Sequence, residues 1–439
     1  MIRIVRYNGG RADALLNRAE EEKRDVSAAV AEIFSQVKTR GDEALFEYCE
    51  KFDGARLENL LVTEREIEAA FESVEPELLR TMELAARNIE RFHLQQKRSG
   101  FVDTPSQGVV VGQRVLPLKS VGLYVPGGTA RYPSSVLMDA IPARIAGVEN
   151  IVMTTPPDRT GGVPAVILAA AKLAGVRTIV KLGGAQAVAA LAYGTETIEP
   201  VCKITGPGNA FVAAAKKIVS GDVGIDMIAG PSEVCVVADE TADPAMVAID
   251  LMAQAEHDPL ASCYLVTFDE GYADKVEAAI EGHMKASTRA EITTASLADQ
   301  GLVVICDSME QAIQSVNVIA PEHLELHFDG AFEQLGAIRN AGAIFVGEWT
   351  PEAVGDYVAG PNHTLPTGGT ARYASPLSTD EFVKHSSVIQ YSAKSLANDA
   401  DAVIAIARHE GLWAHARSVE LRKALVETGD IYGLDGADE

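Results

Sequence analysis

The pattern of apolar and polar residues divides the chain into a helical start, a long central region and a helical tail. Apolar positions recur at three- and four-residue spacing between residues 26 and 37, and in later segments of the first hundred residues, which predicts amphipathic helices. Thr63 and Glu66 have the spacing of a capping box, which marks the start of one such helix. Helical spacing returns from about residue 395, and Gly411 interrupts it.

The central region predicts parallel sheets. Short apolar runs of strand length lie at residues 120–125, 151–153, 178–182 and 201–204, and helices follow them after turns rich in glycine or proline. A second series of strands is predicted at residues 234–238, 264–268, 302–306 and 343–346. Strands that alternate with helices form parallel sheets with crossover helices. We therefore expect two α/β domains, with ligands near the carboxyl ends of the strands.

Composition narrows the class of protein. A chain of 439 residues with 47% hydrophobic residues can bury substantial cores, and a formal charge of −24 argues against nucleic acid or an anionic membrane as a partner. The first residues turn charged too early for a signal peptide, and no apolar run is long enough to span a bilayer. The five cysteines form no C-x-x-C pair, which suits a reducing compartment. We expect a cytoplasmic protein.

One helix of the second series carries candidate chemistry. Asp243 is a natural cap, Pro244 falls at the first helical position, and Pro259 ends the helix. The apolar positions that predict its burial are Met246, Ile249 and Ala253, with Leu251 and Met252 beside them. Gln254 and His257 share a face in its last turn, and an imidazole beside an amide oxygen is half of a metal site. The alternative is a histidine that the helix dipole favours without any metal.

The glycine turns suggest a nucleotide site without the usual signature. No turn has the G-x-G-x-x-G pattern after a strand, so the common dinucleotide fingerprint is absent. Tyr124, Gln186 and Asn209 each lie at or just past the end of a predicted strand, where an aromatic ring and two amides could hold a nucleotide. The alternative is that these glycines serve only as turn residues.

Three further polar segments could carry chemistry. Glu322 beside His323 is a plausible pair of proton acceptors at the entry to an extended segment. Leu324 excludes the zinc-protease motif, which needs a glutamate directly after the first histidine. Asp356, in a loop dense in Gly, Pro, Asn and His, could supply a carboxylate ligand, and the segment 410–415 carries a glutamate and a histidine around a helix break. Each has a plainer alternative as a solvated turn or surface decoration.

These segments together resemble the histidinol dehydrogenase family over nearly the whole chain. The resemblance rests on YVPGGTARYPSS (Tyr124–Ser135), KLGGAQAVAALAYGTE (Lys181–Glu196), GPGNAFV (Gly206–Val212), GPSEV (Gly230–Val234), QAEHDP (Gln254–Pro259), APEHLEL (Ala320–Leu326), GDYVAGPNHTLPT (Gly355–Thr367) and EGLWAH (Glu410–His415). It implies two incomplete Rossmann-like parallel-sheet domains with helical N-terminal and C-terminal extensions. The implied division is an N-terminal arm (1–24), a discontinuous first α/β domain with the metal and catalytic residues (25–120 and 233–380), a second α/β domain on the NAD side (121–232) and a C-terminal tail exchanged in the dimer (381–439).

The resemblance also implies a role for each candidate residue. The implied zinc ion, one per subunit, is held by Gln254, His257, Asp356 and His415, and the implied NAD contacts are Tyr124, Gln186 and Asn209. The implied catalytic pair is Glu322 and His323. The implied substrate contacts are Ser232, Gln254, His257, His323, Asp356, Glu410 and His415. Family members are homodimers in which the tail, with Glu410 and His415, crosses to complete the partner's site.

The implied reaction is the four-electron oxidation of L-histidinol, through L-histidinaldehyde, to L-histidine with two NAD⁺. A neutral imidazole suits His323 as the base for the hydroxyl proton, and Glu322 is the candidate that activates water to hydrate the aldehyde. Zinc would mainly orient the substrate. The alternatives are a related zinc- and NAD-dependent dehydrogenase of another small alcohol such as a sulfonated diol, a metallohydrolase that needs no nucleotide, and a metal-binding protein without activity.

Overall fold

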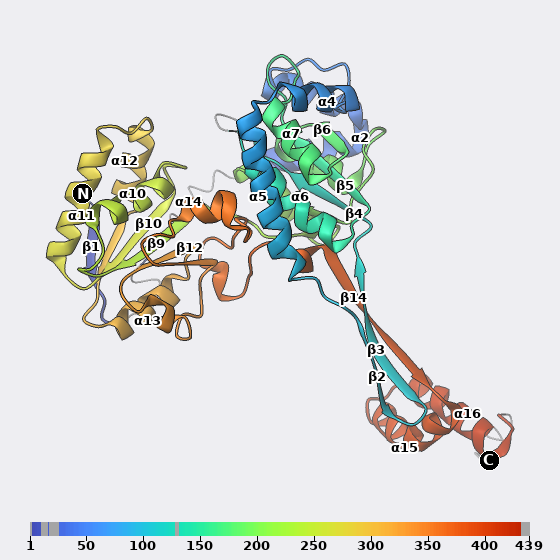
Figure 1. The fold of residues 1–439 in the computed structure, drawn as a ribbon. Coiled ribbons are helices and arrows are strands. Elements are labelled where there is room, and N and C mark those ends of the chain that lie inside the picture. The colour runs from blue at the N-terminus through green and yellow to red at the C-terminus, as the bar shows by residue number, and fades with distance from the viewer. Residues whose placement is uncertain (1, 10–15, 17–25, 128–130, 432–439) are drawn as a thin grey trace. The chain divides into compact units, whose positions relative to one another are not determined.

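A computed structural model describes residues 2–9, 16, 26–127 and 131–431 of the chain (Figure 1). It divides into two units, and each is described by itself. Unit 1 comprises Met1–Lys97 and Leu118–Phe382, and unit 2 comprises Arg98–Pro117 and Val383–Glu439. Unit 1 contains two parallel sheets with crossover helices, which confirms the predicted α/β class.

The first sheet of unit 1 has five parallel strands in the order β6-β5-β4-β7-β8. Its strands are β4 (Ser120–Tyr124), β5 (Asn150–Thr155), β6 (Thr178–Lys181), β7 (Lys203–Thr205) and β8 (Gly224–Ile225). The helices between them are α6 (Pro133–Ala146), α7 (Ala165–Ala174), α8 (Gly184–Tyr193) and α9 (Ala210–Val219). The central strand β4 is buried along its whole length, as its continuous apolar run predicts for a sheet covered on both faces.

The helices of the first hundred residues pack against this five-stranded sheet. They are α2 (Ser27–Arg40), α3 (Asp42–Tyr48) with the helical turn η1 (Cys49–Asp53), α4 (Glu64–Ser73) and α5 (Pro76–Leu94). The capping box of Thr63 and Glu66 is confirmed at the start of α4. Apolar residues of α2, α4 and α5 share two core clusters with those of the sheet. This packing groups residues 27–94 with the five-stranded sheet. The division that grouped them with 233–380 stays a prediction. The exact boundaries stay a prediction.

The second sheet has six parallel strands in the order β1-β11-β10-β9-β12-β13. Its strands are β1 (Arg3–Arg6), β9 (Glu233–Ala238), β10 (Ser262–Thr267), β11 (Leu302–Ile305), β12 (His323–His327) and β13 (Ala343–Val346). The helices are α10 (Pro244–Ala255), α11 (Glu270–Met284), α12 (Ala290–Asp299) and α13 (Met309–Ile319). A purely helical start was therefore the wrong expectation for β1, because four residues are too few to establish a strand pattern without the neighbouring strand β11.

Helix α10 begins as predicted and faces the sheet with a different side. Asp243 caps it by accepting the N–H of Ala245 at 2.8 Å. The residues that it buries are Val247, Ala248, Asp250, Leu251, Met252, Gln254 and Ala255. The predicted stripe of Met246, Ile249 and Ala253 is not the buried one, and Ile249 is 45% exposed. The inward face carries two polar side chains, so a search for apolar spacing selects the wrong side.

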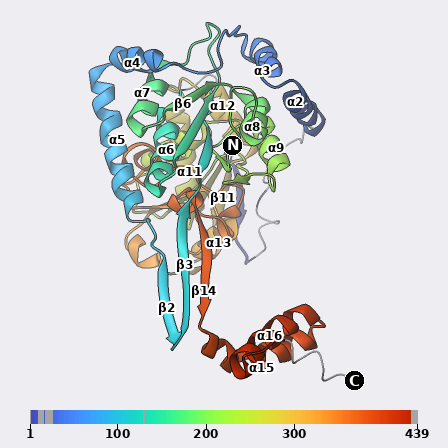
Figure 2. The ribbon, with the colours of Figure 1, turned by 90° about the vertical axis from the view of Figure 1, so that its right-hand side faces the viewer.

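Unit 2 consists of an antiparallel ribbon and a helical hairpin (Figure 2). The ribbon has the strand order β14-β3-β2, with β2 (Phe101–Ser106), β3 (Val109–Pro117) and β14 (Val383–Tyr391). The hairpin comprises α15 (Ala393–His409) and α16 (Trp413–Thr428), with Gly411 at φ 75° in the break, as predicted. Ser395 ties the hairpin to the ribbon, because its Oγ donates to the carbonyl of Gln107 at 2.8 Å.

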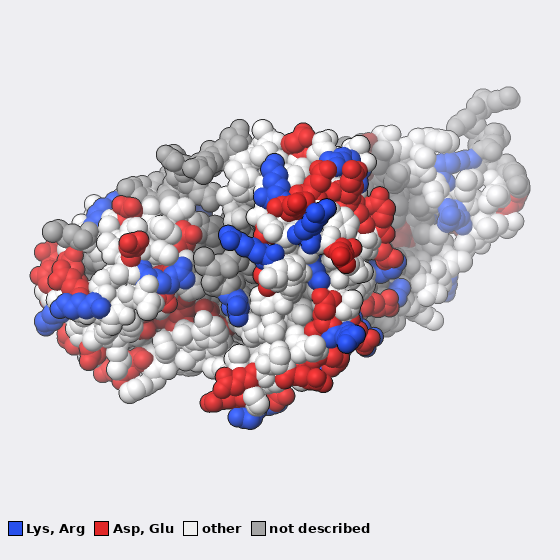
Figure 3. Space-filling model, turned by 90° about the horizontal axis from the view of Figure 1, so that it is seen from above, with Lys and Arg blue, Asp and Glu red and all other residues white. Residues whose placement is uncertain are grey.

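Two general features bear on the partners of the protein. On the face seen in Figure 3, lysine and arginine side chains are interspersed with acidic ones. Among the helices in the described part of the chain, none combines the length and the apolar character needed to cross a membrane.

Candidate active site

The main chain of Glu233, at the start of β9, contacts both predicted catalytic side chains. Its N–H donates to Glu322 Oε2 at 2.9 Å, and its carbonyl oxygen lies 3.2 Å from His323 Nδ1. A carbonyl only accepts, so in the neutral form of the ring this contact favours the proton on Nδ1, with the free lone pair on Nε2. β9 and β12 are adjacent parallel strands, and their register brings these residues together. The extended segment predicted at His323 is confirmed as β12.

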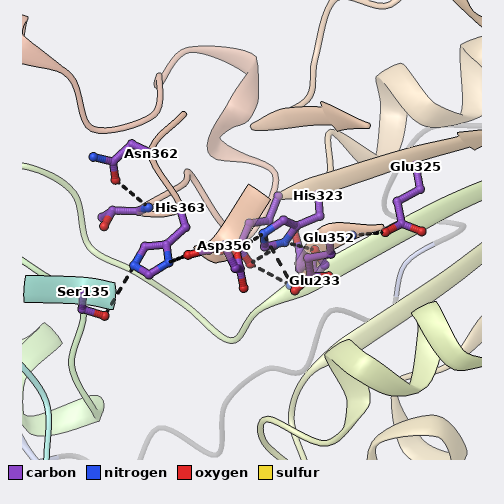
Figure 4. A network of polar contacts seen from close by, with 10 residues as sticks. Ser135, Glu233, His323, Glu325, Glu352, Asp356, Asn362 and His363 are labelled. Carbon is purple, nitrogen blue, oxygen red and sulfur yellow. Dashed lines mark hydrogen bonds and ion pairs between the residues drawn. The ribbon is translucent and has the colours of Figure 1, made fainter. Parts of the chain in front are cut away.

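Carboxylates surround the free nitrogen of His323 (Figure 4). Its Nε2 lies 3.9 Å from Glu352 Oε1 and 3.7 Å from Asp356 Oδ1, and it has no hydrogen-bond partner among the described residues. Glu352 opens the short helix α14 (Glu352–Val354), and Asp356 lies in the following turn η3 (Gly355–Ala359). Single ligand atoms of His323, Glu352 and Asp356 all lie within 4.8 Å of one another, a grouping that suits a cation.

Gln254 reaches the same place from the last turn of α10. With its amide nitrogen turned toward Glu352, it donates to the two carboxylate oxygens at 3.1 and 3.2 Å. The amide oxygen then stays available as a ligand atom. Three elements that are distant in sequence thus bring Gln254, Asp356 and His323 together.

Burial and mutual repulsion shift the titration of this cluster. Burial raises the pKa of Glu322 to about 7 and that of Glu352 to about 8. Burial alone would lower the pKa of His323, but the charges of Glu352, Glu322 and Asp356 raise it to about 10. Without a cation in the cluster the imidazolium is therefore favoured, contrary to the neutral ring expected of His323. Burial opposes ionisation of Asp356 too, yet its contact with His323 and the nearby histidines lower its pKa overall.

The remaining predicted site residues lie in two places. His257 follows the end of α10 instead of lying within its last turn, and its N–H donates to the carbonyl of Gln254 at 3.1 Å. Desolvation lowers the pKa of His257, and the charge of Asp356 opposes this shift. Ser232 directly precedes Glu233 and is half-buried. Glu410 and His415 belong to unit 2, where both are exposed at the break between α15 and α16.

The three predicted nucleotide contacts line one pocket of about 750 Å³ in the lobe of the five-stranded sheet. Tyr124 Oη accepts the N–H of Gly184 at 3.0 Å, at the first residue of α8. Asn209 caps α9, because its Oδ1 accepts N–H groups of the first turn at 3.1 and 3.2 Å. Gln186 lies in the first turn of α8. Two helix N-termini therefore face this pocket, and such termini favour anions.

A buried ion pair fixes the loop between β7 and α9. Gly206 has φ 111°, and a Cβ there would lie 2.1 Å from the Tyr124 carbonyl oxygen, so only glycine fits. Asp226 accepts the Gly206 N–H at 2.8 Å, and Lys216 donates to the Gly206 carbonyl at 2.9 Å. Lys216 and Asp226 also pair with each other out of contact with solvent. The loop that carries Asn209 is thus held at a defined distance from Tyr124.

Several polar residues near the site were not predicted from the sequence. His363 contacts the Asp356 carbonyl at 3.1 Å and Ser135 Oγ at 3.4 Å, which connects the catalytic loop to α6. Asp53 lines the same pocket as Tyr124, Gln186 and Asn209, and its covered Oδ2 has no hydrogen-bond partner among the described residues. Glu325 and His327 lie on the same face of β12 as His323. The alternation HLELH contained that signal, whereas the position of Glu352 depends on tertiary packing and had none.

Comparisons with known proteins show similarity over most of the chain. The sequence model of the histidinol dehydrogenase family matches residues 16–423. Histidinol dehydrogenase of Clostridium acetobutylicum is 51% identical over 409 residues, which cover 93% of this chain and 95% of that protein. Histidinol dehydrogenase of Bacillus subtilis is also 51% identical, with 92% of this chain and 94% of that protein covered.

A solved structure extends the similarity to three dimensions. The crystal structure of histidinol dehydrogenase from Elizabethkingia anophelis matches with a TM-score of 0.93 at 38% sequence identity. The match covers 97% of this chain and 99% of that chain. The similarity therefore extends over both sheets of unit 1 and over unit 2.

Proposed function

The chain belongs to the histidinol dehydrogenase family, and from this premise we propose how its residues divide the work of the reaction. The protein is an NAD-linked oxidoreductase of histidine biosynthesis that acts on histidinol. Family membership supports this function over a dehydrogenase of another small alcohol, a metallohydrolase or an inactive metal-binding protein. The proposal concerns the catalytic residues, the metal, the nucleotide pocket and the subunit assembly.

His323 is the base of the alcohol oxidation. Its Nδ1 proton is engaged by the Glu233 carbonyl, so Nε2 takes the hydroxyl proton while NAD⁺, when bound, accepts the hydride. Glu322 acts in the second oxidation. Its carboxylate takes a proton from the water that hydrates the aldehyde, and the Glu233 N–H fixes its orientation. The observation that supports this division of roles is that the main chain of one residue, Glu233, contacts the buried side chains of both Glu322 and His323.

Zinc would be held by Gln254, His257 and Asp356 from one subunit and by His415 of the tail. The fit rests on the excess of buried carboxylates around His323, which a cation would balance. When bound, zinc would hold and orient the substrate and offset the negative charges that raise the pKa of His323. Single atoms of His323, Glu352 and Asp356 also suit a cation, but a metal on His323 Nε2 would block its role as base.

NAD would occupy the pocket lined by Tyr124, Gln186 and Asn209. The N-termini of α8 and α9 suit the diphosphate, and the pocket also presents the exposed aromatic rings of Phe52 and Phe211, which suit a base.

The tail would complete the site of a second subunit in a homodimer. In the helical hairpin, α15 and α16 bury only small residues, at Ser395, Ala400, Ala407, Ala416 and Ala424. Large apolar side chains remain exposed, with Trp413 at 75% and Ile406 at 61%. A hairpin that buries its small residues and exposes its large ones fits a surface that another chain covers.

The five cysteines are free thiols, which supports a cytoplasmic location.

The decisive experiment counts cofactor per product. Purified protein supplied with zinc, NAD⁺ and L-histidinol should form NADH and histidine in a ratio of about two to one, because two hydride transfers separate an alcohol from an acid. NADH would be followed by absorbance and histidine by chromatography. A chelator should stop turnover, and added zinc should restore it. A ratio of one, with aldehyde accumulating, would contradict the double oxidation.

A further inference from the structure

A second polar cluster, formed by Asp250, Glu325 and His327, lies beside the catalytic residues and takes no part in the chemistry described above. Strand β12 alternates, so His323, Glu325 and His327 point to one face while Leu324 and Leu326 enter the core on the other. Glu325 is fully buried and His327 nearly so. A buried carboxylate is costly unless it has partners, so its contacts call for an explanation.

The partner of Glu325 is the segment that carries Glu352 and Asp356. Glu325 Oε1 accepts the main-chain N–H of Glu352 at 2.7 Å (Figure 4). Glu352 is the first residue of α14, so its N–H has no acceptor inside the helix. The N-cap position, Pro351, has no side chain that could accept this N–H. The carboxylate of Glu325, from strand β12, thus caps α14 and fixes where this helix begins.

The other oxygen of Glu325 faces an imidazole. Glu325 Oε2 lies 3.3 Å from His327 Nε2, and that nitrogen lies 3.6 Å from Asp250 Oδ2. Asp250 precedes Gln254 by one turn of α10, and both are on the buried side. The cluster therefore touches three of the elements that form the site in unit 1: strand β12, helix α10 and the segment that begins at Glu352.

We propose that Glu325 is a positioning residue that locks the segment Glu352–Ala359 against β12, so that Asp356 and Glu352 keep their distance from His323. His327 lies beside the second carboxylate oxygen of Glu325, and Asp250 faces the same imidazole from α10. Residues that orient metal ligands without touching the metal commonly affect metal affinity. The part of this inference that concerns zinc rests on the proposed role of Asp356 as a ligand.

The test compares Glu325→Gln and Glu325→Leu with Leu326→Ala. Gln keeps an oxygen for the Glu352 N–H, whereas Leu keeps only the volume. Leu326→Ala is the matched control, because it weakens the same strand from its opposite face. Hydrogen exchange of the peptide spanning 351–359 in the zinc-free protein measures directly how firmly this segment is held in place. Competition with a chelator reads zinc affinity, and neither measurement depends on activity.

We expect Glu325→Leu to speed exchange in this peptide and to weaken zinc binding by about 10- to 100-fold, with Glu325→Gln between Leu and the parent. Leu326→Ala should lower the melting temperature and leave both readouts within about twofold, since it shares no partner with the cluster. Parent-like exchange in both Glu325 variants would overturn the proposal, and Glu325→Gln decides if the Leu variant does not fold. Faster exchange with unchanged zinc affinity would overturn the link to the metal. If the parent itself binds no zinc, the proposed ligand set fails while the exchange result still decides the role of Glu325.

Discussion

At the scale of single residues, the main chain of Glu233 orients two side chains at once. It engages Nδ1 of His323 and Oε2 of Glu322, and neither contact requires a further side chain. Burial raises the pKa of the Glu322 carboxyl, whereas it opposes protonation of the His323 imidazole. A buried carboxyl resists ionisation, so Glu322 becomes a base close to neutral pH, which suits activation of water.

Glu322→Gln should separate the two oxidations. We expect the rate with L-histidinaldehyde to fall by about 10²- to 10⁴-fold, the range for loss of a general base, while hydride transfer from histidinol changes by less than about tenfold. Single-turnover NADH formation with each substrate measures both. Equal losses would contradict the division of labour.

The pH profile supplies the control. Burial raises the pKa of Glu322 to about 7, and the base acts only when deprotonated, so the second oxidation should gain rate as the pH rises through about 7 and then level off. In Glu322→Gln that rising limb should be absent.

Glu322 and His323 could be proposed as a pair from the sequence because they are adjacent in it. Glu352 could not. Its carboxylate reaches His323 only because α14 follows β13, the strand beside β12, and is pinned there by Glu325. Contacts of this kind depend on the order of strands in the sheet, which local pattern does not encode.

At the scale of elements, α10 shows how function disturbs a pattern. Asp250 and Gln254 face inward to meet His327 and Glu352, so the polar residues lie on the buried side and Ile249 faces outward. Apolar spacing predicted the existence and start of the helix, because capping and proline position are local. It did not predict which side is buried, because that depends on the polar partners of Asp250 and Gln254, which are His327 on β12 and Glu352 on α14.

Helix α9 permits a sharper separation of structure from binding. Asn209 caps the helix with Oδ1 and lines the nucleotide pocket. Asn209→Asp should keep the cap and the melting temperature, but raise the KM for NAD⁺ by about tenfold, because it adds a negative charge where the diphosphate is expected. Asn209→Ala should raise the KM and also cost about 1 kcal/mol of unfolding free energy.

Thermal melts and initial rates at varied NAD⁺ measure these effects. An unchanged KM in both variants, with only the Ala variant destabilised, would make Asn209 a cap and nothing more.

At the scale of the whole molecule, unit 2 was the part least accessible to sequence reasoning. Its helical hairpin was predicted, and the ribbon was not, because β3 pairs with a strand from the far end of the sequence and shows little burial on either side. An element with so little core of its own makes sense when a second subunit supplies the missing contacts.

Mixed dimers test that assembly. One subunit would carry His257→Asn and the other His415→Asn, each with its own affinity tag, so that two-step purification isolates the mixed species. If tails are exchanged, one site collects both substitutions and the other none, so we expect about half of the parent activity. Homodimers of either variant should be inactive. Wholly inactive mixed dimers would rule out exchange.

The pairing of β1 with β11 has a consequence for how the chain is made. Arg3 lies opposite Leu302, so β1 leaves the ribosome roughly 300 positions before the strand with which it pairs. At usual elongation rates this delay is about 15 to 60 s. During synthesis, β1 must stay unpaired without aggregating with other nascent chains. It has only two apolar residues, Ile4 and Val5, and the charged arginines on either side of them oppose such aggregation.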